Sequence, residues 1–361
     1  MKRIFGILKK NNLDAIILTD RYNINYLTKY MGDTGIVLIY EGKSYLLTDS
    51  RYIERASNEA KECTCIDILD KGYSKTICEL LNVDEKIKDN KVIKTGFENN
   101  QISYSQYKAF ADALGNASEL VELNDEIDKL RMIKTDDEVS RIAKAEAIGD
   151  EAFSYIVSYM KAGMTEKEIA LQLEYFMKKK GADGLSFDTI CASGENSSMP
   201  HATPTDRILK EGDFVTMDFG CIYDGYCSDM TRTVLIGNNI TNKQREVYET
   251  VLKAQKAALN AIKPGAVCSE VDKLARDIIK EAGYGKYFGH GLGHSVGLYI
   301  HEEPRLSGRC NAVLQPGMTV TVEPGIYLPG EFGVRIEDLV VVTEDGYRNL
   351  TSSDKNLIMI Q

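Results

Sequence analysis

The chain has 361 residues, which is long enough for two domains that each bury a core. Its formal net charge of −10 argues against nucleic acid or an anionic membrane as a main partner, because their phosphate groups would repel it. We find no apolar stretch of the kind that forms a signal peptide or a membrane span, and the eight cysteines include no C-x-x-C pair, so we expect a cytoplasmic protein without a disulfide framework or zinc knuckle.

Residues 1–125 alternate short β-rich runs with helical stretches. The apolar runs lie at Ala15–Leu18, Gly35–Tyr40 and Tyr45–Leu47. Runs of this length are typical of strands, and their alternation with helices predicts a small α/β domain. We place the boundary just after Leu123–Asn124, which gives an N-terminal domain of residues 1–125 and a second domain of residues 126–361.

Two helices with clear start signals follow this boundary. Thr135 and Glu138 form a capping box that opens a long helix with apolar residues at helical spacing. Gly163 is expected to end this helix, because glycine is favoured just beyond a helix C-terminus. A second capping box, Thr165–Glu168, opens another helix that ends before Gly181.

The second domain repeats a segment of its own sequence. Residues 209–220 (LKEGDFVTMDFG) resemble residues 314–325 (LQPGMTVTVEPG) at a constant offset of 105 positions, since 314 − 209 and 325 − 220 are equal. Upstream, Lys161–Gly163 resembles Lys263–Gly265. Each half is predicted to contain two helices and a β-hairpin, and such a repeat predicts a pseudo-twofold axis with the two hairpins facing each other.

The first predicted hairpin carries two aspartates. Asp218 and Asp229 lie nearly symmetrically about Asp224–Gly225, a dipeptide that strongly favours a hairpin turn. Antiparallel pairing should bring the two carboxylates together. Because side chains alternate along a strand, Thr216 should share the face of Asp218, and Thr231 that of Asp229.

The second predicted hairpin carries two glutamates. Glu323 and Glu337 flank Pro329–Gly330 in the same symmetrical way. Facing hairpins would gather four carboxylates within apolar strands, where they would repel one another unless divalent cations compensated their charge. The sequence therefore predicts a metal site between the hairpins.

All four histidines lie near these hairpins in the sequence. His290, His294 and His301 fall in a glycine-rich stretch that does not suit a helix, so His290 and His294 would share one face of an extended strand as i and i+4. His201 follows a loop-like stretch. A lone histidine is usually structural, but four beside one acidic cluster indicate a functional site. The H-E-x-x-H motif, a phosphate-binding loop and a G-x-S-x-G elbow are absent.

The order of these groups resembles the five-ligand set of the pita-bread metallopeptidases, and the matching residues are Asp218, Asp229, His294, Glu323 and Glu337. The stretch from His290 to Glu302 resembles the motif of the branch that comprises aminopeptidase P and prolidase. The resemblance implies an α/β chain. A creatinase-type N-terminal domain, serving oligomerisation or substrate gating, would precede an α+β pita-bread catalytic domain.

The same resemblance implies hydrolysis of the peptide bond before proline, by a hydroxide that two divalent ions activate. Mn²⁺ suits a carboxylate-rich set with one imidazole, and Co²⁺ or Zn²⁺ are alternatives. Asp218 would chelate one ion, and His294 and Glu323 would bind the other. Asp229 and Glu337 would bridge both.

The remaining roles implied by the resemblance concern protons and substrate. Glu323 would act as the proton shuttle, and His201 and His301 would hydrogen-bond the substrate carbonyl and the developing oxyanion. His290 would shape the pocket for proline. Arg335 would orient a carboxylate, or would form an ordinary salt bridge between strands.

Several alternatives remain open on this fold. A methionine aminopeptidase, or another amidohydrolase, would use the same ligands, although the former does not need the first domain. Creatinase has both domains but works without metal, and a non-catalytic binding protein would have lost ligands. Aminopeptidase P and dipeptidase are not distinguished. The expected partners are small peptides with proline second, and a second copy of the chain in a homodimer.

Overall fold

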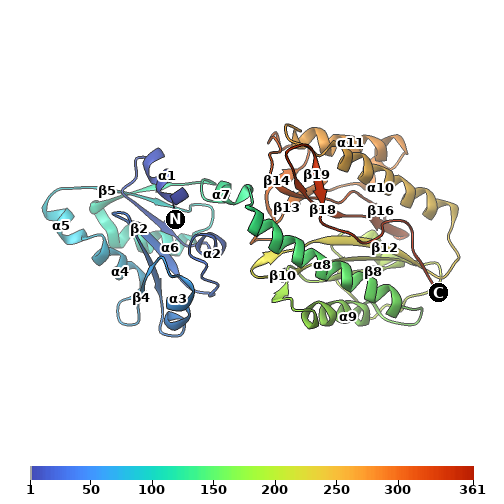
Figure 1. The fold of residues 1–361 in the computed structure, drawn as a ribbon, viewed down its shortest axis with the longest axis horizontal. Coiled ribbons are helices and arrows are strands. Elements are labelled where there is room, and N and C mark those ends of the chain that lie inside the picture. Colours follow the sequence, from blue (N-terminus) through green and yellow to red (C-terminus); the bar gives the residue numbers. More distant parts are fainter. Residues whose placement is uncertain (1) are drawn as a thin grey trace. The chain divides into compact units, whose positions relative to one another are not determined.

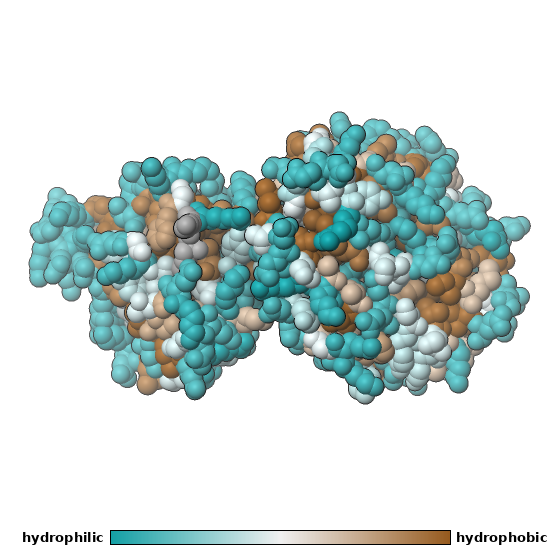
Figure 2. Space-filling view, viewed as in Figure 1, coloured by the Kyte–Doolittle hydropathy of each residue, from teal (hydrophilic) through white to brown (hydrophobic). Residues whose placement is uncertain are grey.

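The computed structural model describes residues 2–361. Its residue contacts divide the chain into one unit that ends at Arg131 and a second unit, Met132–Gln361. Figure 1 colours the first unit from blue to cyan-green and the second from green to red. Among residues 2–361, no helix is both long enough and apolar enough to cross a membrane. Hydrophilic residues predominate on the face of each unit shown in Figure 2.

The first unit is built on one six-stranded sheet with the strand order β4-β3-β2-β1-β5-β6. The central strand β1 pairs antiparallel with β2 and parallel with β5. The strands are β1 (Ala15–Leu18), β2 (Ile36–Tyr40), β3 (Lys43–Thr48), β4 (Thr64–Asp67), β5 (Ile93–Phe97) and β6 (Ser118–Glu122). The three apolar runs of the sequence are thus confirmed as β1, β2 and β3.

Helices cover both faces of this sheet. Alternate residues of β1 point to opposite faces, with Ile16 and Leu18 in one core cluster and Ala15 and Ile17 in the other. Both faces of the central strands are therefore buried, which explains why these strands are apolar without interruption. The helices are α1 (Lys2–Lys10), α2 (Arg21–Thr28), α3 (Ile53–Glu59), α4 (Gly72–Leu80), α5 (Val83–Lys88) and α6 (Tyr104–Leu114), and the short α7 (Asp128–Met132) follows them.

Four helices and several small sheets make up the second unit. Figure 1 shows its strands between α10 and α11 on one side and α9 on the other. The helices are α8 (Asp136–Tyr159), α9 (Glu166–Lys179), α10 (Asn242–Ala261) and α11 (Cys268–Glu281). Its strands are β7 (Gly184–Leu185), β8 (Ile190–Ser193), β9 (Phe214–Phe219), β10 (Cys221–Tyr223), β11 (Tyr226–Cys227), β12 (Met230–Ile236), β13 (Gly293–Ser295), β14 (Glu302–Leu306), β15 (Thr319–Val322), β16 (Gly325–Leu328), β17 (Phe332–Arg335), β18 (Asp338–Val342), β19 (Tyr347–Asn349) and β20 (Met359–Ile360).

Both predicted capping boxes are confirmed. Thr135 accepts a hydrogen bond from the backbone of Glu138, and Glu138 accepts one back. The second box, at Thr165, opens α9 in the same way. The predicted end of the first helix was wrong, because α8 stops at Tyr159 and Met160 is already extended. Gly163, with φ +92°, belongs to the connection that follows.

The internal repeat appears as matching backbone hydrogen bonds. Gly163 N–H donates to Leu209 O at 2.9 Å, and Gly265 N–H donates to Leu314 O at the same distance. Leu209 N–H and Leu314 N–H return bonds to Met164 O and Ala266 O. The helices that follow are α9 in the first half and α11 in the second. Each of these helices therefore follows a turn with the same hydrogen-bond pattern, so the two halves are built in the same way.

The first predicted hairpin is interrupted. Its turn at Asp224–Gly225 is confirmed, since both residues have positive φ as a tight hairpin turn requires. However, Asp218 pairs with Thr231, not with Asp229. Asp229 lies in the gap between β11 and β12 and not in a strand with Thr231 as expected, although both side chains approach Glu337. The tip strands β10 and β11 pair with each other, and β10 also pairs with β7, in a separate small sheet.

The second hairpin is interrupted at the equivalent place. β15 pairs with β18, and β16 pairs with β17, as two separate ladders. Glu323 lies between β15 and β16, and Glu337 lies between β17 and β18. In both halves the acidic residues therefore lie at or beside a break in the hairpin, where the backbone is free to turn their side chains toward one place.

Candidate active site

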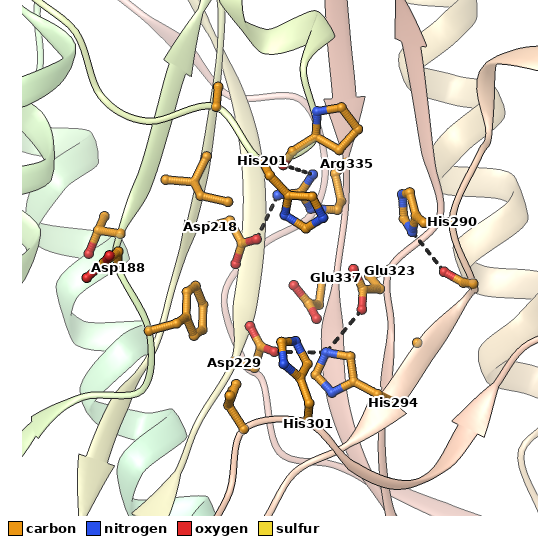
Figure 3. A pocket seen from close by; sticks show the side chains of 18 of the residues that line it. Asp188, His201, Asp218, Asp229, His290, His294, His301, Glu323, Arg335 and Glu337 are labelled. Atoms are coloured by element: carbon orange, nitrogen blue, oxygen red, sulfur yellow. Dashed lines mark hydrogen bonds and ion pairs between the residues drawn. The ribbon is translucent and has the colours of Figure 1, made fainter. Parts of the chain in front are cut away.

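A cavity of about 530 Å³ opens in the second unit at these breaks. Figure 3 shows the two pairs of carboxylates around its centre, with His290 on one side and Asp188 on the other. Residues Phe187–Ile190 and Ile300 form a partly apolar wall. Every site residue that the sequence predicted lines this cavity: His201, Asp218, Asp229, His290, His294, His301, Glu323, Arg335 and Glu337.

The carboxylates and one imidazole converge closely. Asp218, Asp229 and Glu337 each offer one oxygen, and these atoms all lie within 4.8 Å of one another. His294 Nε2 lies 3.4 Å from Asp229 Oδ2 and 3.4 Å from Glu323 Oε1. The five groups that the sequence singled out are thus within reach of shared ions.

In two of these carboxylates, one oxygen accepts a hydrogen bond from another side chain and the other oxygen has no donor among the described residues. Asp218 Oδ2 accepts from Arg335 Nη2 at 2.7 Å, and Glu337 Oε2 accepts from Thr231 Oγ1 at 2.7 Å. Asp218 Oδ1 and Glu337 Oε1 are buried and have no hydrogen-bond partner among the described residues. Buried carboxylate oxygens without donors are costly, and hard divalent cations are the partners that they suit. The residues therefore fit a metal centre.

Burial and mutual repulsion dominate the electrostatics of the cluster. Desolvation, followed by the charges of Glu337 and Asp218, raises the pKa of Asp229 well above its usual range. The pKa of Glu337 is raised in the same way, first by desolvation and then by the charges of Glu323 and Asp218. Desolvation also raises the pKa of Glu323, to about 7. Without a cation, these side chains would hold protons near neutral pH.

The affinity of the metal-free protein for Mn²⁺ should therefore rise with pH between 6 and 8. A bound cation must displace the protons that the raised pKa values of Asp229, Glu323 and Glu337 retain, and each displaced proton adds up to about tenfold in affinity per pH unit. Isothermal titration calorimetry in two buffers with different ionisation enthalpies measures both the affinity and the proton release. An affinity that does not change with pH would contradict the protonated cluster.

The buried histidines are neutral and their tautomers are fixed by backbone carbonyls. Desolvation lowers the pKa of His294 to about 3 and that of His290 to about 4. His294 Nδ1 donates to Ser295 O at 3.1 Å, which leaves the lone pair of Nε2 facing the carboxylates. The predicted shared strand was wrong, because β13 includes His294 but not His290. Both side chains nevertheless line the same cavity.

Arg335 connects the carboxylates to the histidine side of the cavity. Its Nη2 binds Asp218, and its Nη1 donates to Tyr327 Oη at 2.8 Å. Tyr327 Oη in turn lies 2.9 Å from His290 Nε2. The other ring nitrogen of His290, Nδ1, donates to the carbonyl oxygen of Gly291. The guanidinium therefore forms a salt bridge that also fixes the direction of the Asp218 carboxylate.

The loop that carries His201 is anchored by one buried carboxylate. Glu166, which is fully buried at the start of α9, accepts six hydrogen bonds from Ser193, Asn196 and Thr205. Ser193 and Thr205 lie at the two ends of the loop, and His201 and its neighbours between them line the cavity. Glu166 thus closes the loop at its base.

Replacing Glu166 by glutamine should lower kcat/KM for a substrate bound in this cavity about tenfold and the free energy of unfolding by about 2–3 kcal/mol, because an amide nitrogen would face backbone donors. The Mn²⁺ affinity should not change, since the loop holds none of the clustered acids. Calorimetry and steady-state kinetics test this, with Glu174→Gln on the same helix as control. Equal losses in both variants would contradict the role of the anchor.

Sequence reasoning missed several residues that line or support the cavity. Tyr327 and Glu166 are ordinary strand and helix residues in the sequence, and only the fold shows what they contact. Arg305 lines the cavity and donates to His301 O at 3.3 Å. The nearness of Arg305 to His301 in the sequence was the one available signal, and it was not used.

Comparison with known proteins gives concordant results along the whole chain. Residues 140–344 match the family described as metallopeptidase family M24, and residues 1–133 match the creatinase/prolidase N-terminal domain. A protein of Pyrococcus furiosus described as "Xaa-Pro dipeptidase" is 39% identical over 359 residues, which cover 99% of each chain.

Solved structures agree with these matches. A structure described as an Xaa-Pro dipeptidase from Bacillus anthracis is 41% identical, with a TM-score of 0.90 over 99% of this chain and 98% of that one. A structure described as an X-Pro aminopeptidase from Thermotoga maritima is 37% identical, with a TM-score of 0.87 over 97% of this chain and 98% of the other.

Proposed function

The chain belongs to metallopeptidase family M24 and carries a creatinase/prolidase N-terminal domain, and from this premise we propose that it is a metal-dependent Xaa-Pro dipeptidase. The observation that carries the proposal is the convergence of Asp218, Asp229, His294, Glu323 and Glu337 on one cavity. Two full-length relatives, 39% and 41% identical to this chain, are described as Xaa-Pro dipeptidases.

The proposed metal ligands divide between two ions. Asp218 would hold one ion, His294 and Glu323 the other, and Asp229 and Glu337 both. Mn²⁺ is the proposed metal, with Co²⁺ or Zn²⁺ as alternatives, because hard carboxylate oxygens outnumber the single imidazole. When bound, the ions would supply Lewis acidity to the scissile carbonyl and lower the pKa of a water molecule.

The chain's own side chains would move protons and stabilise charge. Glu323 would take a proton from the attacking water on its carboxylate and pass it to the leaving nitrogen of proline. His201 and His301, which line the cavity from opposite segments, would donate hydrogen bonds to the carbonyl oxygen as negative charge develops. Desolvation lowers the pKa of His301, so its ring is a neutral donor.

Recognition of proline would use the side of the cavity where the Tyr327 hydroxyl joins His290 to Arg335. The tertiary amide of an Xaa-Pro bond has no N–H, so a pocket without an acceptor there loses nothing. Arg305 is a cavity cation beside His301, and its charge suits the free carboxylate of a terminal proline. A carboxylate requirement of this kind favours dipeptides.

The proposal is tested by hydrolysis of Leu-Pro, Leu-Pro-Gly and Leu-Ala with metal-stripped protein, before and after addition of Mn²⁺. Cleavage of Leu-Pro alone, restored by the metal, is the expected result. Cleavage of Leu-Pro-Gly as well would make the enzyme an aminopeptidase P. Tight Mn²⁺ binding with no cleavage of either proline peptide would contradict the proposed substrate and favour another amide.

Substitution of Arg305 by alanine should raise KM for Leu-Pro about tenfold or more, because an ion pair to the substrate carboxylate is lost. The kcat value should change less, since Arg305 is not one of the clustered metal-site groups. Leu-Pro amide, which lacks the carboxylate, serves as the matched substrate and should show nearly the same KM with both proteins. An equal rise in KM for the two substrates would contradict the pairing.

Two further proposals concern the protein's surroundings. All eight cysteines are free thiols, which supports a reducing compartment such as the cytoplasm. We also propose that the protein is a homodimer. Light scattering coupled to size-exclusion chromatography would give a mass of one chain if this is incorrect.

A further inference from the structure

A buried lysine contacts the two residues that directly follow His294 and His301 in the sequence. Lys134, 6% exposed, immediately precedes the N-cap of α8. Its Nζ donates to Ser295 Oγ at 2.9 Å and lies 3.1 Å from Glu302 Oε2. Both partners are themselves buried. A buried ammonium is expensive unless it is paired and hydrogen-bonded, so its position needs an explanation.

The two partners of Lys134 are the neighbours of two site histidines. Ser295 directly follows His294, and its carbonyl accepts the hydrogen bond that fixes the His294 tautomer. Glu302 directly follows His301. One ammonium thus holds both ends of the segment 295–302, and it reaches them across 161 and 168 positions of the sequence.

The rest of this segment is fixed by bonds that extend from the same point. Ser295 Oγ lies 3.1 Å from Thr319 Oγ1, which donates to Val296 O at 2.7 Å. Glu302 Oε1 accepts from the backbone of Tyr299 at 3.2 Å. Glu302 also packs against Gly297, where any side chain would overlap its carboxylate. A chain of hydrogen bonds therefore runs from Lys134 into the turn that carries His301.

We propose that Lys134 is a positioning residue that sets the mutual placement of His294 and His301 by tying Ser295 to Glu302. The two imidazole rings lie edge to face with centroids 4.6 Å apart. This spacing depends on where strands β13 and β14 are held at their irregular pairing between His294 and Ser295. The inference rests on the proposed function, in which one ring binds metal and the other stabilises the oxyanion.

A purely structural role makes a different prediction, and a pair of variants separates the two. Lys134→Met leaves the Glu302 carboxylate buried without its cation and should lower the melting temperature. The double variant Lys134→Met/Glu302→Gln removes both charges, and should recover most of that melting temperature because no unpaired charge remains. Only the positioning role predicts that the double variant stays impaired, since the side-chain link through Lys134 is then lost and the backbone pairing of Ser295 with position 302 is left alone.

The experiment compares these variants with Arg141→Met, which removes a partly buried cation whose ion pairs are with Asp137 and Asp224. For each metal-stripped protein, scanning calorimetry gives the melting temperature and titration with MnCl₂ gives the dissociation constant. Kinetics with Leu-Pro at saturating Mn²⁺ give kcat and KM. Loss of a residue that orients metal ligands typically costs about 10- to 100-fold in metal affinity or activity.

The expected result is a dissociation constant for Mn²⁺ raised about tenfold and a kcat lowered about tenfold in both Lys134 variants, with little change in KM or in the control. Wild-type affinity and kcat in the thermally recovered double variant would overturn the proposal and leave Lys134 a structural residue. If Lys134→Met does not fold, Ser295→Ala breaks one of the two links without unpairing a charge, and wild-type values there would overturn it equally. Wild-type protein that binds Mn²⁺ without cleaving Leu-Pro would refute the proposed function alone, because the affinity comparison still tests Lys134.

Discussion

Replacement of Asp229 by asparagine is expected to lower kcat/KM for an Xaa-Pro dipeptide by at least about 10³-fold. Asp229 lies close to proposed ligands of both ions. Its carboxylate is within 4.8 Å of the oxygens of Asp218 and Glu337, and 3.4 Å from His294 Nε2. Asparagine keeps the shape but removes the charge, so an ion shared between the two groups would lose its bridge.

The stability of the metal-free protein should change in the opposite direction. The pKa of Asp229 in the folded state is raised well above its value of about 3.9 in the unfolded chain. The free energy of unfolding therefore falls as the pH rises from the unfolded-state pKa to the folded-state pKa. Metal-free Asp229→Asn avoids this loss and should unfold at a higher temperature than metal-free wild type at pH 7.5, but not at pH 4. Mn²⁺ should then raise the melting temperature of the wild type far more than that of the variant.

Scanning calorimetry with and without Mn²⁺ measures these differences, and kinetics with Leu-Pro measure the loss of activity. The matched control is Asp206→Asn, because that carboxylate is 83% exposed and pairs only with Lys167 among the ion pairs described. It should behave as wild type in all three measurements. An Asp229→Asn protein that is both inactive and less stable without metal would indicate general disruption of the fold instead of loss of a ligand.

Local signals in the sequence identified the elements whose physics is local. The capping boxes at Thr135 and Thr165 were predictable because the bonds that they make span three residues. Uninterrupted apolar runs identified β1, β2 and β3, since these strands are buried on both faces. The internal repeat then placed Asp218 with Glu323 and predicted two carboxylate pairs at one place, and the resemblance to the pita-bread metallopeptidases implied His294 as the fifth ligand.

Contacts between distant segments could not be predicted in this way. The hairpins were expected to be continuous, and no local sequence signal indicated that both would be interrupted beside their acidic residues. The partner of Arg335, 117 positions away, and the partners of Lys134 follow only from how the two halves pack. Tyr327 was missed for the same reason, because its hydroxyl matters only once Arg335 and His290 lie on either side of it.

Substitution of Arg335 by lysine tests the most extensive of these contacts and keeps the positive charge. The guanidinium is nearly fully buried and donates to four groups: Thr231 Oγ1 at 3.0 Å, Pro200 O at 3.2 Å, Tyr327 Oη at 2.8 Å and Asp218 Oδ2 at 2.7 Å. These acceptors surround a planar fork. A single ammonium cannot reach all of them, so at least one buried acceptor would lose its donor.

The expected effect of Arg335→Lys is a fall in kcat/KM of about 10²-fold, equivalent to about 2.7 kcal/mol, together with weaker Mn²⁺ binding. The loss should exceed that of Tyr327→Phe, which removes only the hydroxyl link to His290, and Arg348→Lys on the exposed strand β19 should be neutral. Titration calorimetry and Leu-Pro kinetics on the three variants decide the matter. If Arg335→Lys retains wild-type affinity and rate, charge alone is sufficient beside Asp218, and the fork geometry contributes nothing to catalysis. A loss confined to KM would instead assign Arg335 to substrate binding, because a misdirected Asp218 carboxylate must lower kcat as well.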